Sequence, residues 1–154
     1  MPSYKKVIKK LLKRNISISI AESCTGGLLS SKFTSVAGIS KIFNMGLITY
    51  SNKSKSSLLK ISQNDLKKYG SVSHQTAALM VKNLQRLTKS KLCISTTGIA
   101  GPSGGTKERP VGLIYFGIKY RNKTIILEKK FKGSRMQIQQ KMVKAIFTTL
   151  EKLI

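Results

Sequence analysis

The chain has 154 residues, of which 40% are hydrophobic, and this is enough for one domain with one buried core. Its 29 Lys and Arg residues and five acidic residues give a formal net charge of +24, so the chain should attract anions. One histidine, two cysteines and the lack of any apolar run of about 18 residues argue against a zinc site, a disulfide framework and a membrane-spanning helix.

The first half of the chain alternates predicted helices and strands. Apolar residues at helical spacing predict an amphipathic helix over 4–13, and alternating Ile and Ser predict a strand over 16–21. After a glycine turn, the pattern predicts the elements helix 28–36, strand 43–50, short helix 53–59 and short helix 63–68.

The second half continues this alternation and adds one hairpin. Ser73 should cap a helix whose inward side carries Ala77, Met80, Val81, Leu84 and Leu87, and a strand is predicted over 92–96. A glycine-rich loop over 98–112 precedes two strands, 113–120 and 124–131, and Ser134 should cap the final helix. We therefore predict one α/β domain over 1–154, with three layers and a mixed β-sheet that has helices on both faces.

The amino-terminal segment and the cysteine content predict the cellular compartment of the protein. Residues 1–14 contain several lysines, but they lack the apolar stretch and the small-residue cleavage site of a signal peptide. Two cysteines in a chain of this size are typical of a reducing compartment. We expect a cytoplasmic protein that does not associate with membranes.

A first candidate site joins the end of a predicted strand to the start of a helix, over 21–27. Ser23 and Thr25 provide hydroxyls there, and the unpaired amides of a helix amino terminus favour an anion or an amide. An ordinary capped turn would have the same composition. Cys24 has no histidine close by in sequence, so we interpret it as a packing residue.

A second candidate is a serine–lysine pair formed by Ser40 and Lys55. Such pairs hydrolyse amides without histidine, provided that burial or cationic neighbours keep the lysine partly neutral. The competing interpretation is that Lys55 is one of many solvated lysines. The single histidine, His74, follows Ser73 at a helix start, where a capping or surface role is expected. Catalysis should therefore depend on hydroxyls, Lys, Arg and backbone amides, with no metal and no cofactor.

Two further candidates lie later in the chain. The loop that follows the strand over 92–96 should present backbone N–H groups to a phosphate or an oxyanion, through Thr97, Gly98, Ile99, Ala100 and Gly101. A loop of this length in a small domain favours a function. Arg135, at the start of the last helix, could hold a phosphate or could simply be exposed.

These segments, in this order, resemble the CinA C-terminal domain family. The matching segments are AESCTGG at 21–27, AGIS at 37–40, TYSNKSK at 49–55, GSVS at 70–73, TGIAGPSGGTKERPVG at 97–112 and GSR at 133–135. They span nearly the whole chain, and the segment at 97–112 is long and highly specific.

The resemblance implies a metal-free amidohydrolase that converts nicotinamide mononucleotide to nicotinic acid mononucleotide and ammonia. Transferred by position, Ser40 and Lys55 would be the catalytic pair. The residues implied at the substrate site are Ser23, Tyr50, Thr97 and Arg135. A glutaminase-like mechanism or one led by Ser23 remains the nearest alternative among enzymes.

The high charge leaves a second class of function open. The alternative is a basic protein, associated with nucleic acid, that uses the same scaffold without amidohydrolase activity. Because the lysines are scattered along nearly the whole chain, we expect nucleic-acid binding to be at most weak and non-specific. The expected partners are the nucleotide substrate and further copies of the chain in a homo-oligomer.

Overall fold

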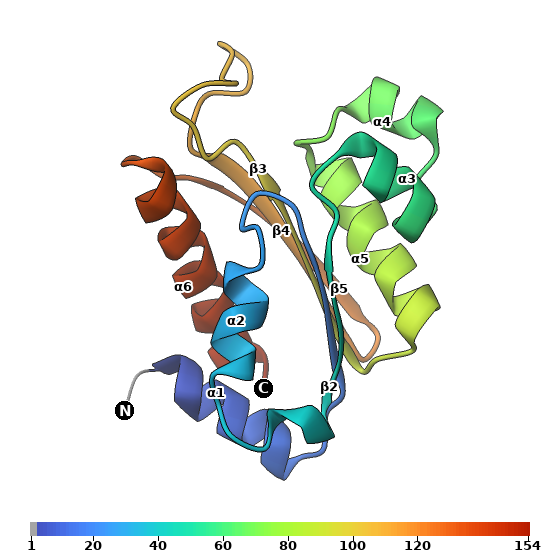
Figure 1. The fold of residues 1–154 in the computed structure, drawn as a ribbon, viewed down its shortest axis with the longest axis vertical. Coiled ribbons are helices and arrows are strands. Elements are labelled where there is room, and N and C mark those ends of the chain that lie inside the picture. The colour runs from blue at the N-terminus through green and yellow to red at the C-terminus, as the bar shows by residue number, and fades with distance from the viewer. Residues whose placement is uncertain (1–2) are drawn as a thin grey trace.

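A computed structural model describes residues 3–154 and shows a three-layer α/β domain (Figure 1). The central sheet has five strands in the order β2-β1-β3-β4-β5. Its first three strands in the chain run parallel, whereas β4 is antiparallel to both of its neighbours. This arrangement confirms the predicted mixed sheet. The strands are β1 (Ile18–Glu22), β2 (Phe43–Ile48), β3 (Leu92–Gly98), β4 (Leu113–Tyr120) and β5 (Lys123–Lys130).

Helices cover both faces of the sheet, as the sequence predicts. Figure 1 shows α1, α2 and α6 on one face and α3, α4 and α5 on the other. The helices are α1 (Ser3–Lys13), α2 (Leu28–Thr34), α3 (Asn52–Leu59), α4 (Gln63–Tyr69), α5 (His74–Thr88) and α6 (Arg135–Leu153), and a short 3-10 turn, η1 (Ile39–Lys41), precedes β2.

The larger part of the core lies under α1, α2 and α6. The long helix α6 buries Ile138, Met142, Ile146 and Leu150, which recur at intervals of four residues and form one apolar stripe. Ser134 caps this helix and accepts a hydrogen bond from the backbone N–H of Gln137. The cap and the stripe together fix where α6 begins and how it is rotated, and this rotation determines which of its side chains reach the candidate site.

A smaller core cluster lies under α5 on the opposite face. Met80, Val81 and Leu84 are fully buried there, and Ser73 caps the helix as predicted. The prediction that Leu87 points inward is wrong, because 53% of this side chain is exposed. It follows Leu84 in the last turn of α5, where the helix passes the edge of the cluster.

Most predicted boundaries agree with the structure to within a few residues. β3 continues two residues beyond its predicted end, to Gly98, because Thr97 and Gly98 still pair with β4. The turn between β4 and β5 contains two residues, Arg121 and Asn122, and not the three that the sequence suggested. Arg121 adopts a positive φ of 55°, which a two-residue hairpin turn requires at its first position.

The topology brings distant segments together at one edge of the sheet. The carboxyl ends of β1, β2 and β3 lie side by side, so the segments that follow these three strands are neighbours in space. A crevice beyond the carboxyl ends of parallel strands is where open α/β sheets bind ligands. None of the helices among residues 3–154 has the length and apolar composition needed to cross a lipid bilayer.

Candidate active site

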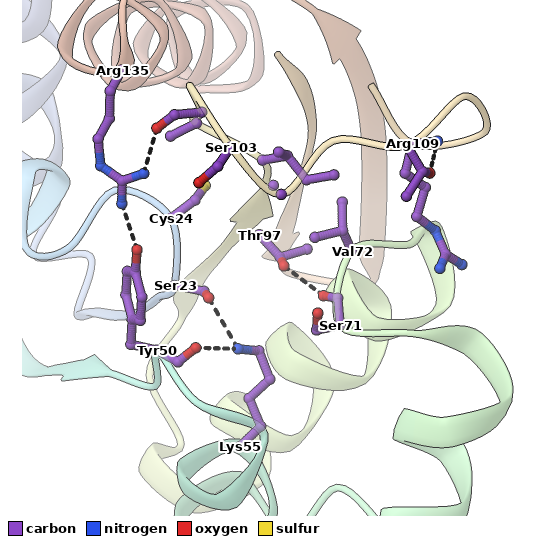
Figure 2. Close-up of a pocket in the computed structure, with 16 residues that line it drawn as sticks. Ser23, Cys24, Tyr50, Lys55, Ser71, Val72, Thr97, Ser103, Arg109 and Arg135 are labelled. Atoms are coloured by element: carbon purple, nitrogen blue, oxygen red, sulfur yellow. Dashed lines mark hydrogen bonds between the residues drawn. The ribbon is translucent and has the colours of Figure 1, made fainter. Parts of the chain in front are cut away.

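A cavity of about 410 Å³ opens at the carboxyl ends of the parallel strands. Ser23, Tyr50 and Lys55 line it on one side, and residues 97–101 line it on another (Figure 2). Arg135 reaches it from the start of α6. These residues come from segments up to 112 positions apart in the sequence, and the sheet topology is what brings them together.

One wall of this cavity contains a contact between a lysine and a serine. Lys55 Nζ donates a hydrogen bond to Ser23 Oγ over 3.0 Å. The same ammonium group also donates to the backbone carbonyls of Thr49, at 2.7 Å, and Tyr50, at 3.3 Å. Lys55 is completely buried, so the interpretation that it is a solvated surface lysine is wrong. Its amine is held in a fixed position against one hydroxyl.

Burial changes the protonation of Lys55. Loss of contact with water lowers the pKa of its amine from 10.5 to about 8, because the charged form is penalised in a less polar environment. With that pKa, about one molecule in ten carries a neutral amine at pH 7. A neutral amine next to a hydroxyl can act as a general base.

The expected pairing of Ser40 with Lys55 is wrong. Ser40 lies in η1, before β2 begins, whereas Lys55 lies in α3, after β2 ends. The six residues of β2, at about 3.3 Å each, place these two positions roughly 20 Å apart at opposite ends of the strand. Ser40 is exposed and is not among the residues that line the cavity.

The turn after β1 is held in place by a buried carboxylate. Glu22 accepts hydrogen bonds from the backbone N–H groups of Leu29, at 2.9 Å, and Ser30, at 3.0 Å, and so caps the start of α2. It also accepts one from Thr25 Oγ1 over 2.6 Å. The Thr25 hydroxyl lies 2.9 Å from Thr96 Oγ1 as well. Thr25 is therefore turned away from the cavity, and its predicted contact with the substrate is wrong.

Cys24 lies beside Ser23 but has the properties of a packing residue. Its thiol is buried and donates to Met142 Sδ over 3.4 Å. Burial raises the pKa of this thiol to about 12, so it stays protonated at neutral pH. This environment agrees with the interpretation of Cys24 as part of the core.

The glycine-rich loop forms the wall of the cavity that faces the serine–lysine pair. Thr97, Gly98, Ile99, Ala100 and Gly101 all line the cavity, so the structure brings together the loop residues that the sequence singled out. The hydroxyl of Thr97 donates to the carbonyl of Ser71 over 2.6 Å. Gly101 has a φ of 79°, and a side chain at this position would collide with Val111.

Arg135 joins the loop to the segment after β2. Its Nη1 donates to the carbonyl of Gly101 over 2.8 Å, and its Nη2 donates to the Tyr50 hydroxyl. Figure 2 shows the guanidinium and Lys55 on opposite sides of Ser23. The cavity thus presents the guanidinium of Arg135 on one side of Ser23 and the amine of Lys55 on the other.

Several cavity residues were not singled out as site residues from the sequence. Ser71 and Val72 belong to the GSVS segment at 70–73, whose position in the family pattern was the only available signal. Arg109, which also lines the cavity, donates to the carbonyl of Tyr69 over 2.7 Å. This contact connects the glycine-rich loop to the end of α4.

The histidine does not line the cavity, and the potential metal ligands do not form a cluster within residues 3–154. His74 is exposed at the start of α5, where a surface histidine was expected. Within residues 3–154, no three side chains of the types His, Cys, Asp and Glu gather in a way that could hold a metal ion. The polar side chains that line the cavity carry hydroxyl, amine and guanidinium groups.

Comparison with known families and sequences gives matches over almost the entire chain. A family model described as CinA C-terminal domain matches residues 2–154. A relative from Caldanaerobacter subterraneus subsp. tengcongensis is 45% identical over 148 residues, which are 96% of this chain and 36% of the relative. One from Clostridium novyi is 48% identical over 135 residues, or 88% of this chain and 33% of the relative. Both have the provisional name competence-damage inducible protein, and this chain spans about a third of their length.

Solved structures give the same family relationship. The competence/damage inducible protein CihA from Agrobacterium tumefaciens is 34% identical, with a TM-score of 0.90 over 98% of this chain and 91% of that one. A protein of the competence-damaged protein (CinA) superfamily from Escherichia coli is 26% identical, with a TM-score of 0.93 over 99% of this chain and 88% of that one.

Proposed function

The chain belongs to the CinA C-terminal domain family, and we propose that it hydrolyses the carboxamide of nicotinamide mononucleotide to nicotinic acid mononucleotide and ammonia. The observation that carries the proposal is the 3.0 Å contact between Lys55 Nζ and Ser23 Oγ, in a cavity that also presents Arg135. The pair supplies a nucleophile and its base, and the arginine suits a substrate with a phosphate group.

Activation of Ser23 follows from the three groups around the lysine amine. In its neutral form the amine has two hydrogens, and the carbonyls of Thr49 and Tyr50 accept both of them. The lone pair of the nitrogen then points to the remaining neighbour, the hydroxyl of Ser23. Lys55 removes the hydroxyl proton as the Ser23 oxygen forms a bond to the carboxamide carbon.

The tetrahedral intermediate carries a negative oxygen that needs hydrogen-bond donors. The N–H of Ile99 is unavailable, because it donates to the carbonyl of Leu113 over 2.9 Å. Among residues 3–154, the N–H groups of Ala100 and Gly101 donate to no other protein group. These two amides of the cavity wall are the ones we assign to the oxyanion.

Release of ammonia returns the proton. The Lys55 ammonium donates its proton to the amide nitrogen, the carbon–nitrogen bond breaks, and ammonia leaves behind a nicotinoyl ester on Ser23. Lys55, neutral again, takes a proton from a water molecule that attacks the ester carbon. Lys55 returns this proton to the Ser23 oxygen as the ester bond breaks, which releases the carboxylic acid product and restores the hydroxyl of Ser23. No step requires a metal or an organic cofactor.

The remaining cavity residues select the substrate. The hydroxyl hydrogen of Thr97 is used by the carbonyl of Ser71, so its oxygen is left as an acceptor for the carboxamide N–H. The guanidinium of Arg135 has five N–H donors, and the contacts to Gly101 and Tyr50 occupy two of them. Three donors remain for a phosphate, and Tyr50 would contact the ring or the ribose.

An assay of ammonia release from nicotinamide mononucleotide tests this function. We expect turnover by the wild-type chain that dialysis against EDTA leaves unchanged, and we expect nicotinic acid mononucleotide as the second product. Ser23→Ala provides the matched inactive control. A chain that folds but releases no ammonia, or one whose activity depends on added zinc or magnesium, would contradict the proposal.

A second cavity supports the alternative function, association with nucleic acid. This cavity has a volume of about 780 Å³ and lies at the other end of the sheet, near the β4–β5 turn. Five of its ten lining residues are basic and none is acidic; the basic ones are Arg14, Lys89, Lys91, Lys119 and Arg121. Such a surface would attract phosphates through charge alone, without reading their sequence.

A further inference from the structure

One face of α6 contacts the candidate active site at three positions. Arg135, Gln139 and Met142 follow each other at intervals of four and three residues, so they lie on the same side of the helix. Arg135 donates to the carbonyl of Gly101, and Met142 accepts from the thiol of Cys24. Between them, the side-chain amide of Gln139 donates from Nε2 to the backbone carbonyl of Cys24 over 2.9 Å.

The contact made by Gln139 completes the support of the turn that carries Ser23. Before the serine, its own N–H donates to the carbonyl of Thr96 over 3.0 Å, and this fixes the turn to β3. After it, the N–H of Gly26 donates to the Ser23 carbonyl over 3.1 Å. The next carbonyl, that of Cys24, receives its hydrogen bond from Gln139, so the amide of α6 fixes the peptide between Cys24 and Thr25, one residue beyond the serine.

We propose that Gln139 is a positioning residue for the nucleophile. It acts through the carbonyl of Cys24 and keeps Ser23 Oγ within reach of Lys55 Nζ. The inference rests on the proposed role of Ser23. Because the 3.0 Å contact between the two reacting groups is already in the upper part of the range for proton transfer, a small shift of the turn would weaken it.

The packing of α6 on the sheet does not depend on the Gln139 side chain, whereas the proposed position of the Ser23 turn does. Gln139 is half-buried, whereas the neighbouring positions Ile138, Met142 and Ile146 supply the apolar contacts that attach α6 to the sheet. Loss of the Gln139 amide should therefore leave the helix in place and release the turn. A misplacement of about 1 Å can reduce catalysis by about a hundredfold.

The adjacent residue offers a matched control. Gln140 points to a different cavity, which Tyr4, Leu28 and Phe147 also line. We expect Gln139→Leu and the nearly isosteric Gln139→Glu each to lower kcat by about ten- to hundredfold and to change KM by less than about threefold. Gln140→Leu should leave both constants unchanged. Because Lys55 keeps its bonds to Thr49 and Tyr50, the midpoint of the pH profile should remain near 8 in all three variants.

A readout that needs no substrate separates this proposal from the proposed function. Hydrogen exchange of the backbone amides of residues 23–27 should be faster in both Gln139 variants than in the wild-type chain and in Gln140→Leu, with α6 equally protected in all. Unchanged exchange in both variants, a kcat within about twofold of wild type in both, or an equal loss in Gln140→Leu would overturn the assignment. If the wild-type chain releases no ammonia, the proposed function fails, while the exchange rates still decide whether Gln139 holds the turn.

Discussion

The two ends of the parallel strands use the same kinds of residue in different ways. At the carboxyl ends, a serine, a lysine and an arginine surround one cavity, and the lysine is completely buried. At the amino ends, Ser40 is exposed in a short turn and the basic residues line an open second cavity. Residue type alone therefore does not distinguish the two ends. Whether a residue comes before or after its strand is what indicates whether it lies at the candidate active site.

The largest expected difference between the two ends concerns the two serines. Ser23→Ala should reduce ammonia release from nicotinamide mononucleotide by about a thousandfold or more, as loss of a catalytic nucleophile generally does. Ser40→Ala, at the other end of β2, should change it by less than about twofold. The assay is steady-state turnover, with circular dichroism to check folding. The opposite ranking of the two variants would return the nucleophile to Ser40.

The two ends should also differ in how their arginines affect substrate choice. Arg135→Ala should lower kcat/KM for nicotinamide mononucleotide by about ten- to a hundredfold, since a charged contact to the phosphate is lost. Nicotinamide riboside, which lacks the phosphate, should be a poor substrate for the wild-type chain and should be equally poor for the variant. Arg121→Ala, at the second cavity, serves as the control and should affect neither substrate. Equal use of both substrates by the wild-type chain would contradict the phosphate role of Arg135.

Burial of a charged lysine should lower the stability of the fold. The pKa of Lys55 in the folded chain, about 8, is below its ordinary value of 10.5, so the charged form is disfavoured by folding. This penalty is present in full below about pH 8 and decreases as the pH rises from 8 to 10.5. Lys55→Met should abolish turnover and yet raise the free energy of unfolding at pH 7 by about 1–3 kcal/mol.

Chemical denaturation at several pH values would measure this effect. The gain from Lys55→Met should shrink as the pH rises above 8, because the wild-type lysine then becomes neutral in the folded chain. Lys91→Met, at an exposed position of the opposite end, should change the stability by less than about 0.5 kcal/mol at any pH. A loss of stability in Lys55→Met at pH 7 would indicate that the hydrogen bonds of the amine outweigh the cost of its burial.

The same pKa predicts how turnover depends on pH. If the neutral amine of Lys55 is the base, as we propose, kcat/KM should rise about tenfold for each pH unit below 8 and reach a plateau above it. His74 is exposed at the start of α5, so His74→Ala should leave the profile unchanged. A profile with its midpoint near 6.5, the ordinary value for histidine, would contradict the assignment of the base to Lys55.

The fold was largely predictable because local patterns determine it. Helical and alternating periodicity gave the order and type of the elements, and Ser73 and Ser134 marked the starts of α5 and α6 correctly. The residues of the site were only partly predictable. Ser23, Lys55 and residues 97–101 do come together at the cavity, because each of these segments lies at or beyond the carboxyl end of a parallel strand.

The two wrong site assignments, Ser40 and Thr25, and the one missed contact, that of Gln139, each have a physical reason. Ser40 precedes the strand that Lys55 follows, so the strand itself separates them, and the predicted element order already contained this information. Thr25 was assigned to the substrate because it adds a hydroxyl at the turn where a helix begins, but this hydroxyl donates to a buried carboxylate, that of Glu22. Gln139, which the sequence did not single out, bonds to the carbonyl of Cys24 across 115 positions, and no local pattern indicates such a contact.

The last and smallest expected effect concerns the basic cavity at the amino ends of the strands. If the charge of +24 acts as a whole, nucleic acid should bind weakly and without sequence preference, and binding should weaken steeply between about 50 and 200 mM salt. Lys89→Glu and Lys91→Glu would each remove about one phosphate contact and reduce the slope of log K against log salt by about 1 if the second cavity is the contact surface. Lys9→Glu, on the exposed side of α1, is the control with the same charge change. An equal reduction in all three variants would mean that nucleic acid contacts the positive charge over the whole surface and not the second cavity in particular.

Ammonia release, which depends on short contacts at the other end of the sheet, should be the same in all three variants at about 150 mM salt. Tight, sequence-selective binding at that salt concentration, together with no ammonia release, would favour nucleic-acid association over hydrolysis.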